Sequence, residues 1–109
     1  MAYDEALAER LRAHLEGEPG LSEKRMFGGI AFLINGNMAC GVNQTDLIVR
    51  IDPDTHADAM AEPGARQFDL SARPMKGWVS VDADGYRADA DLGRWVERGL
   101  RFARGLPPK

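Results

Sequence analysis

The pattern of apolar positions is strongest between residues 25 and 42, where two apolar runs flank the dipeptide Asn35-Gly36. Asn-Gly between two such runs is the strongest short-range sign of a β-hairpin, because both central residues of a type I′ turn need a positive φ. The sequence therefore predicts two antiparallel strands that turn back at residues 35 and 36. We expect the rest of the chain to pack on this hairpin.

The two faces of the predicted hairpin follow from its turn, since side chains alternate across a sheet. In this register Ile34 faces Asn37, Leu33 faces Met38 and Ala31 faces Cys40. One face then carries Phe27, Gly29, Ala31, Leu33, Met38, Cys40 and Val42. The other carries Met26, Ile30, Phe32 and Ile34, with Ala39 and Gly41 opposite them. Both faces are apolar, whereas antiparallel sheets commonly have one solvated face. We therefore expect another segment of this chain, or a second copy of it, to cover the second face.

Two segments have the 3.6-residue periodicity of amphipathic helices. The first is predicted over residues 3–16, where apolar side chains recur every fourth position, and Asp4 and Glu5 carry negative charge at its start. The second begins at Asp89 as N-cap and ends near Gly105. Its apolar stripe consists of Leu92, Trp95, Val96, Gly99, Leu100 and Ala103.

The remaining predicted elements are shorter. Residues 21–24 lead into the hairpin, 71–76 form a loop that includes Pro74, and 82–85 form a turn. Strands are predicted at 47–51, 66–70 and 77–81, and a short helix from Pro53 to about residue 61. The order α-β-β-β-α-β-β-α predicts an α+β, two-layer fold: an antiparallel sheet of about five strands with the N- and C-terminal helices on one face.

Composition sets limits on what the chain can be. Its 109 residues predict a single domain over 1–109. The formal net charge of −3 gives no overall attraction for polyanions. Cys40 is the only cysteine, so an internal disulfide is excluded and a cytoplasmic location is expected. We expect neither a signal peptide nor a membrane partner, because the first residues are acidic and no apolar run could cross a bilayer.

Several segments together resemble a known family: RMFGG at 25–29, NGNM at 35–38, DLIVR at 46–50 and MKGWV at 75–79. With the helix around Trp95-Val96 they are similar to the N-terminal domain of the TfoX/Sxy competence regulators. The resemblance implies an α+β fold and a link to the regulation of DNA-uptake competence, where longer members act with a cyclic-AMP-responsive transcription activator. Those members carry a second, helical domain, so here we expect the N-terminal domain alone. The resemblance implies no catalytic residues.

Three patterns could indicate chemistry, but each has a simpler structural explanation. Gly28-Gly29 lacks the further residues of a phosphate-binding loop, so we expect it to allow close approach of the N- or C-terminal helix. The spacing Ser80, Asp82, Asp84, Gly85, Asp91 resembles a calcium loop, but a strand precedes it and a turn with an N-cap explains it. The remaining reactive side chains have no metal-ligand or nucleophile-base spacing, and we expect a buried Cys40 with His14 and His56 at the surface. We therefore predict no catalytic residue, cofactor or metal.

Arginines recur along the last predicted helix. Arg94, Arg98 and Arg101 line up on one side and form a candidate nucleic-acid face. Asp89, Asp91 and Glu97 dilute this charge, so we favour a solvated helix face instead.

The sequence leaves three functional hypotheses. The favoured one is a non-enzymatic regulatory or protein-interaction domain that binds a protein partner, or forms a homodimer through Ile30, Phe32 or Ile34. The second is nucleic-acid association through the arginine face. The third is a small anionic ligand bound in a pocket beside Arg25, Arg50 and Lys76. The candidate interaction residues are Arg25, Phe27, Gly28, Gly29, Ile30, Phe32, Ile34, Arg50, Lys76 and Trp78.

Overall fold

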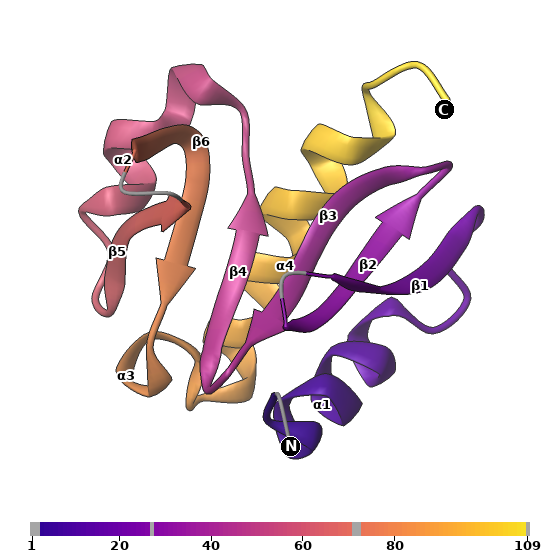
Figure 1. Ribbon diagram of the computed structural model, residues 1–109, viewed down its shortest axis with the longest axis horizontal. Coiled ribbons are helices and arrows are strands. Elements are labelled where there is room, and N and C mark those ends of the chain that lie inside the picture. The colour runs from indigo at the N-terminus through magenta and orange to yellow at the C-terminus, as the bar shows by residue number, and fades with distance from the viewer. Residues whose placement is uncertain (1–2, 27, 71–72, 109) are drawn as a thin grey trace.

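The computed structural model describes residues 3–26, 28–70 and 73–108, with side chains except at 26, 69–70 and 73–76. Six strands form one sheet in the order β1-β2-β3-β4-β6-β5, and every neighbouring pair is antiparallel (Figure 1). The elements are α1 (Glu5–Leu15), β1 (Leu21–Met26), β2 (Gly29–Ile34), β3 (Asn37–Asn43), β4 (Asp46–Arg50), the 3₁₀ turn η1 (Pro53–Thr55), α2 (His56–Met60), β5 (Ala65–Leu70), β6 (Arg73–Val81), α3 (Ala83–Tyr86) and α4 (Asp89–Arg104).

This architecture confirms the predicted α+β class, with two differences in the strands. Residues 21–24 belong to β1, an additional edge strand that pairs with β2 along its whole length. Arg25 and Met26, predicted in the first hairpin strand, also belong to β1. Its polar sequence LSEKRM lacks the apolar alternation that predicts a strand, because β1 is an edge strand with its polar side chains exposed. The second difference is β6, which begins at Arg73, inside the predicted loop.

The predicted β2–β3 turn is confirmed, since Asn35 has φ 52° and Gly36 has φ 87°. The predicted pairing beyond Leu33 and Met38 is wrong by one residue. Phe32, not Ala31, faces Cys40, because Ala39 is an extra residue in β3 that forms a β-bulge. The bulge leaves both Ala39 and Cys40 in the core that the helices cover.

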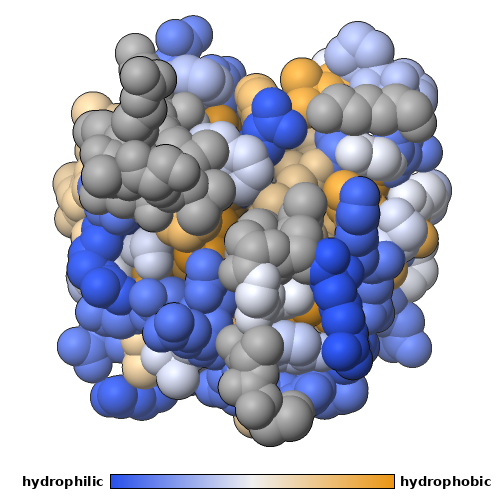
Figure 2. Space-filling view, viewed as in Figure 1, coloured by the Kyte–Doolittle hydropathy of each residue, from blue (hydrophilic) through white to orange (hydrophobic). Residues whose placement is uncertain are grey.

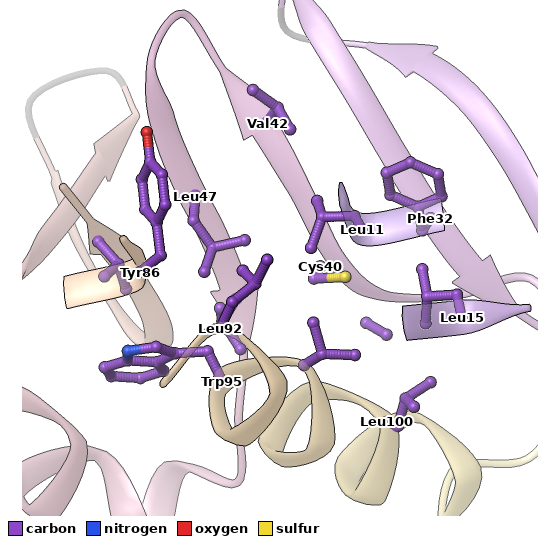
Figure 3. Close-up of a cluster of buried hydrophobic side chains, with 14 of the residues drawn as sticks. Leu11, Leu15, Phe32, Cys40, Val42, Leu47, Tyr86, Leu92, Trp95 and Leu100 are labelled. Atoms are coloured by element: carbon purple, nitrogen blue, oxygen red, sulfur yellow. The ribbon is translucent and has the colours of Figure 1, made fainter. Parts of the chain in front are cut away.

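The main core lies between the sheet and the helices α1 and α4 (Figure 3). Phe32 is wholly buried there among Leu11 and Leu15 of α1, and Ile30 and Ile34 are 3% and 2% exposed. The predicted dimer interface through Ile30, Phe32 or Ile34 is therefore wrong, because helices of the same chain cover these side chains. Sequence alternation identified their shared face but not what covers it.

A second apolar cluster lies on the opposite face of the sheet, so the prediction that both faces are apolar is confirmed. The predicted membership is wrong for Cys40 and Val42, because the bulge at Ala39 turns them into the main core. Neighbouring positions along β2 and β4 alternate between the two clusters. Four members of the second cluster are buried, and Leu33 and Trp78 are partly exposed. The buried members are Ala31, Met38, Ile48 and Phe68.

The two terminal helices are held in place by capping and by ion pairs. Asp4 accepts hydrogen bonds from the backbone N–H groups of Ala6 and Leu7 at the start of α1. Asp89 is not the predicted N-cap of α4: it lies inside the helix, and its carboxylate pairs with His14 at 3.0 Å. No helix among the described residues is long and apolar enough to cross a lipid bilayer.

Gly29 is required by a close approach to the next strand and not, as predicted, by a helix. A Cβ atom at this position would lie 1.9 Å from the carbonyl oxygen of Val42 in β3. This distance is far inside van der Waals contact, so a side chain would separate β2 from β3.

Arg104 joins the end of α4 to the loop before β1, and this contact makes stability depend on pH. Its Nε and Nη2 atoms donate to the two carboxylate oxygens of Glu18 at 2.8 and 2.7 Å. This hydrogen bonding lowers the pKa of Glu18 from its ordinary 4.5. A carboxylate whose pKa is lower in the folded chain stabilises the fold above its ordinary pKa, and the contribution is lost as pH falls through the folded value.

We therefore expect Arg104→Gln to reduce the loss of stability that accompanies acidification below pH 4.5, the ordinary glutamate pKa. Urea unfolding at a series of pH values measures the slope of the free energy of unfolding against pH. The matched control is Arg87→Gln, because the Arg87–Asp84 pair is 74% and 75% exposed and contributes little. An equal change of slope in both variants would contradict the assignment to Glu18.

Candidate functional site

A hollow of about 360 Å³ lies between the last turns of α4 and the connection from β4 into η1. We call it the α4 hollow; it is lined by Ile51, Asp52, Thr55, Arg98, Arg101, Phe102, Gly105 and Leu106. In Figure 2 the surface is notched at its upper edge, where apolar and strongly hydrophilic side chains meet. Its volume lies at the lower end of the range for small-ligand pockets.

Arg50 connects this hollow to the face of the sheet opposite the helices. Its guanidinium carbon lies 5.2 Å from the ring centre of Phe102 and 5.4 Å from that of Trp78. Both distances are within the range of cation–π attraction, so the two rings hold the guanidinium in place. Arg50, Phe102 and Trp78 are all partly exposed. Arginine and tryptophan on a partly exposed surface are the residue types that carry most binding energy at protein interfaces.

The arginines of α4 differ in their partners. Arg94 and Arg98 share Glu62, at 3.7 and 3.3 Å, and Arg94 also pairs with Asp91 at 2.7 Å. Arg98 in addition lies 5.2 Å from the ring centre of Trp95. Among the described residues, neither Arg101 nor Arg50 lies within ion-pair distance of a carboxylate. Two arginines without a carboxylate partner in the described part of the chain therefore lie beside the α4 hollow, and another, Arg25, lies apart from them on β1.

The structure thus brings together residues that the sequence assigned to separate sites. Arg50 and Trp78 came from the candidate interaction set, whereas Arg98 and Arg101 came from the candidate nucleic-acid face. They meet because Arg50 is paired with Trp78 in the sheet and α4 packs against β4 with Phe102 next to Arg50.

The other candidate interaction residues are not part of this site. Arg25 lies in β1 and lines a separate hollow with Arg12 and Glu23, which are already paired with each other at 2.9 Å. The predicted pocket that combines Arg25 with Arg50 is therefore absent, since β2 and β3 separate their strands. Gly28 lies exposed between β1 and β2. Phe27 and the side chain of Lys76 fall outside the described residues.

Sequence reasoning missed the apolar part of the hollow. The sequence pattern places Ile51 in a strand, and no predicted site includes Phe102 or Leu106. A signal for it was present in the last helix, because Arg98, Arg101, Phe102 and Gly105 stand at i, i+3, i+4 and i+7 and so share one helix face. That stripe mixes charged and apolar residues and therefore does not stand out as amphipathic.

The cysteine and the two histidines have contacts within the fold. Cys40 is fully buried, and burial raises the pKa of its thiol to about 12, so it is not a nucleophile at neutral pH. The Nδ1 atom of His56 accepts a hydrogen bond from the backbone N–H of Gly77 at 3.1 Å. Both histidines, predicted as surface residues, are partly buried.

The segment with calcium-loop spacing contains a short helix, α3, where the sequence predicts a turn, and the capping residue is Asp82 and not the predicted Asp89. The carboxylate of Asp82 accepts a hydrogen bond from the backbone N–H of Asp84 at 3.1 Å and caps α3. Gly85 packs tightly, since a Cβ atom there would lie 2.5 Å from the carbonyl oxygen of Pro63. These contacts give Asp82 and Gly85 structural roles.

The fold and the hollow together define an α+β domain with helices on one face of an antiparallel sheet and an arginine-rich, partly apolar hollow at the end of the last helix. The sequence model of one protein family, the TfoX N-terminal domain, matches residues 13–103 of the chain. The chain therefore belongs to this family, and the resemblance predicted from its sequence is confirmed. A search of curated proteins finds no match to the chain.

Proposed function

We propose that this chain is a non-enzymatic regulatory domain that acts by binding another protein at the α4 hollow. The observation that carries the proposal is the position of Arg50. Its guanidinium lies within cation–π distance of both Trp78 and Phe102 beside the hollow, without a carboxylate partner among the described residues. A charged group held by two rings is preorganised, so little side-chain entropy is lost when a partner binds it.

The chemistry of the hollow favours binding over catalysis. The hydroxyl of Thr55 donates to the backbone carbonyl of Asp52 at 2.9 Å, and the carboxylate of Asp52 accepts from the backbone N–H of Asp54 at 2.9 Å. Both polar side chains are thus engaged in capping η1. Arginine, which remains charged at any physiological pH, serves as an anion receptor and not as a general base.

The regulatory part of the proposal rests on the family. Membership in the TfoX N-terminal domain family, with the resemblance to competence regulators, supports a partner from the transcriptional control of DNA uptake. We propose the cytoplasm as the compartment, which is compatible with the free thiol of Cys40. Nucleic acid is a less suitable partner, because Arg94 and Arg98 of the predicted arginine face already pair with Glu62.

Site-specific photo-crosslinking in cells tests this function. A photo-reactive phenylalanine analogue replaces Leu106, which lines the hollow, and in a matched control it replaces Ala13, which is exposed on α1. We expect a crosslinked protein with the probe at 106 and none at 13. Mass spectrometry of the adduct identifies the partner and the segment attached.

The outcomes separate the alternatives. A regulator of transcription attached at 106 supports the whole proposal, whereas a protein of another process supports the binding site and contradicts the competence link. If the crosslinked protein is a second copy of this chain, the α4 hollow is a homodimer interface and not the binding site of a different protein. Absence of an adduct at 106, or an equal adduct at 13, would contradict binding at the α4 hollow.

A further inference from the structure

We infer that the α4 hollow recognises an acidic segment of the partner protein, with one apolar side chain of that segment in the hollow and its carboxylates on Arg50 and Arg101. This inference rests on the proposed function and adds the chemistry of the partner. It follows from the charge, the shape and the spacing of the groups around the hollow.

Charge is the first argument. The chain carries a net charge of −3, and most described arginines lie within 4 Å of a carboxylate. Arg25, Arg50 and Arg101 are exceptions, and only the last two of these three lie beside Phe102. An arginine binds a carboxylate through two parallel hydrogen bonds, which are stronger than bonds between neutral groups. Two such arginines on one surface therefore favour an acidic partner.

The apolar lining is the second argument. Ile51, Phe102 and Leu106 bring apolar side chains to the hollow between the charged groups. Burying an apolar side chain there would contribute affinity that charges at the rim alone do not supply. An apolar anchor surrounded by polar contacts is the common arrangement of protein hot spots.

Spacing is the third argument, and it distinguishes a peptide segment from other anions. Arg50 contacts the ring of Phe102 but does not line the hollow, so a ligand that reaches the hollow, Arg101 and Arg50 must extend beyond it. A compact anion would fill the hollow without reaching Arg50. A nucleic-acid backbone carries a charge at every nucleotide, so it would also bring phosphates next to Asp52 and Glu62, where they would be repelled. A peptide can place uncharged residues at those positions.

Selection from a library of random displayed peptides, with the intact chain as bait, tests the inference without assuming a partner. We expect enriched peptides to place Asp or Glu beside Leu, Phe or Trp. A selected peptide is then synthesised with a fluorescent label, together with an analogue in which Gln and Asn replace its acids. The analogue should bind about 10-fold more weakly or worse, as expected for lost charge-assisted hydrogen bonds.

Two arginine variants of the chain locate the binding. Arg101→Glu should weaken the binding of the peptide by about 10-fold or more, since it removes one charge-assisted contact and adds repulsion. Arg25→Glu is the matched control, because Arg25 is also exposed and unpaired among the described residues but lies on β1. It should leave the affinity unchanged. Circular dichroism confirms that both variants are folded.

Several results would overturn the inference: enriched peptides without acids, equal binding of the amide analogue, equal effects of the two variants, or no enrichment. If single-stranded DNA binds the chain and the Arg94→Glu and Arg98→Glu variants lose this binding, the ligand is a polyanion and not an acidic peptide. A partner crosslinked at residue 106 through a segment without acids would contradict this inference and leave the proposed function intact. Absence of any crosslink would instead contradict the proposed function.

Discussion

Replacing Phe32 with alanine lowers the free energy of unfolding by about 3–5 kcal/mol, the range for large-to-small changes in a close-packed core. Phe32 is wholly buried between β2 and α1, with Leu11 and Leu15 beside it (Figure 3). The guanidinium of Arg12 lies 5.9 Å from its ring centre. The substitution leaves a cavity where α1 meets the sheet. Urea unfolding followed by circular dichroism measures the loss.

Phe102→Ala is the matched control, because it deletes the same atoms from a half-buried ring that borders the α4 hollow. Its loss of unfolding free energy should be clearly smaller, since part of the ring already faces open space. Equal losses in the two variants would contradict the assignment of Phe32 to the face that α1 covers.

Replacing Gly99 with alanine should destabilise the chain by about 1–3 kcal/mol, the usual effect of overpacking. A Cβ atom at Gly99 in α4 would lie 2.3 Å from the carbonyl oxygen of Ala39, the extra residue of the β3 bulge. This neighbour is backbone within a paired strand and cannot rotate away, so α4 would have to move from the sheet. Thermal unfolding measures the effect.

Gly93→Ala provides the control within the same helix. A Cβ atom there would lie 3.2 Å from the ring of His14, a side chain that can shift. Glycine within a helix is less stable than alanine by about 0.5–1 kcal/mol, so this variant should be neutral or more stable. Opposite signs for Gly99→Ala and Gly93→Ala would confirm that the bulge sets the distance between α4 and the sheet. Equal stabilisation of both would contradict it.

Most of the fold could be predicted from local patterns. The Asn35-Gly36 turn follows from backbone preference, and the last helix follows from its periodicity, because both signals lie within a few residues. The bulge at Ala39 could not be predicted, since nothing local indicates an extra residue and its carbonyl lies against Gly99 of α4, which is distant in the sequence. This one extra residue shifts the pairing of β2 with β3 by one position from Phe32 onward, on the side away from the turn.

The site was predictable only in its separate parts. Arg50 is a candidate because its positive charge suits an anionic ligand, Trp78 because tryptophan commonly anchors a core or an interface, and Arg101 because arginine repeats along the helix. Their meeting depends on the strand order, in which β6 and not β5 lies next to β4. Sequence alone does not give this order, so it could not show that Phe102 brings Arg50 to the α4 hollow.

The most direct test of the binding surface is amide hydrogen exchange of the chain, with and without the protein captured at residue 106. Partner binding should slow exchange in residues 51–55 and 98–106, the two segments that line the α4 hollow. Exchange along β1 and the exposed face of α1 should stay unchanged. Slower exchange over β1 and β2, with residues 98–106 unaffected, would contradict the account.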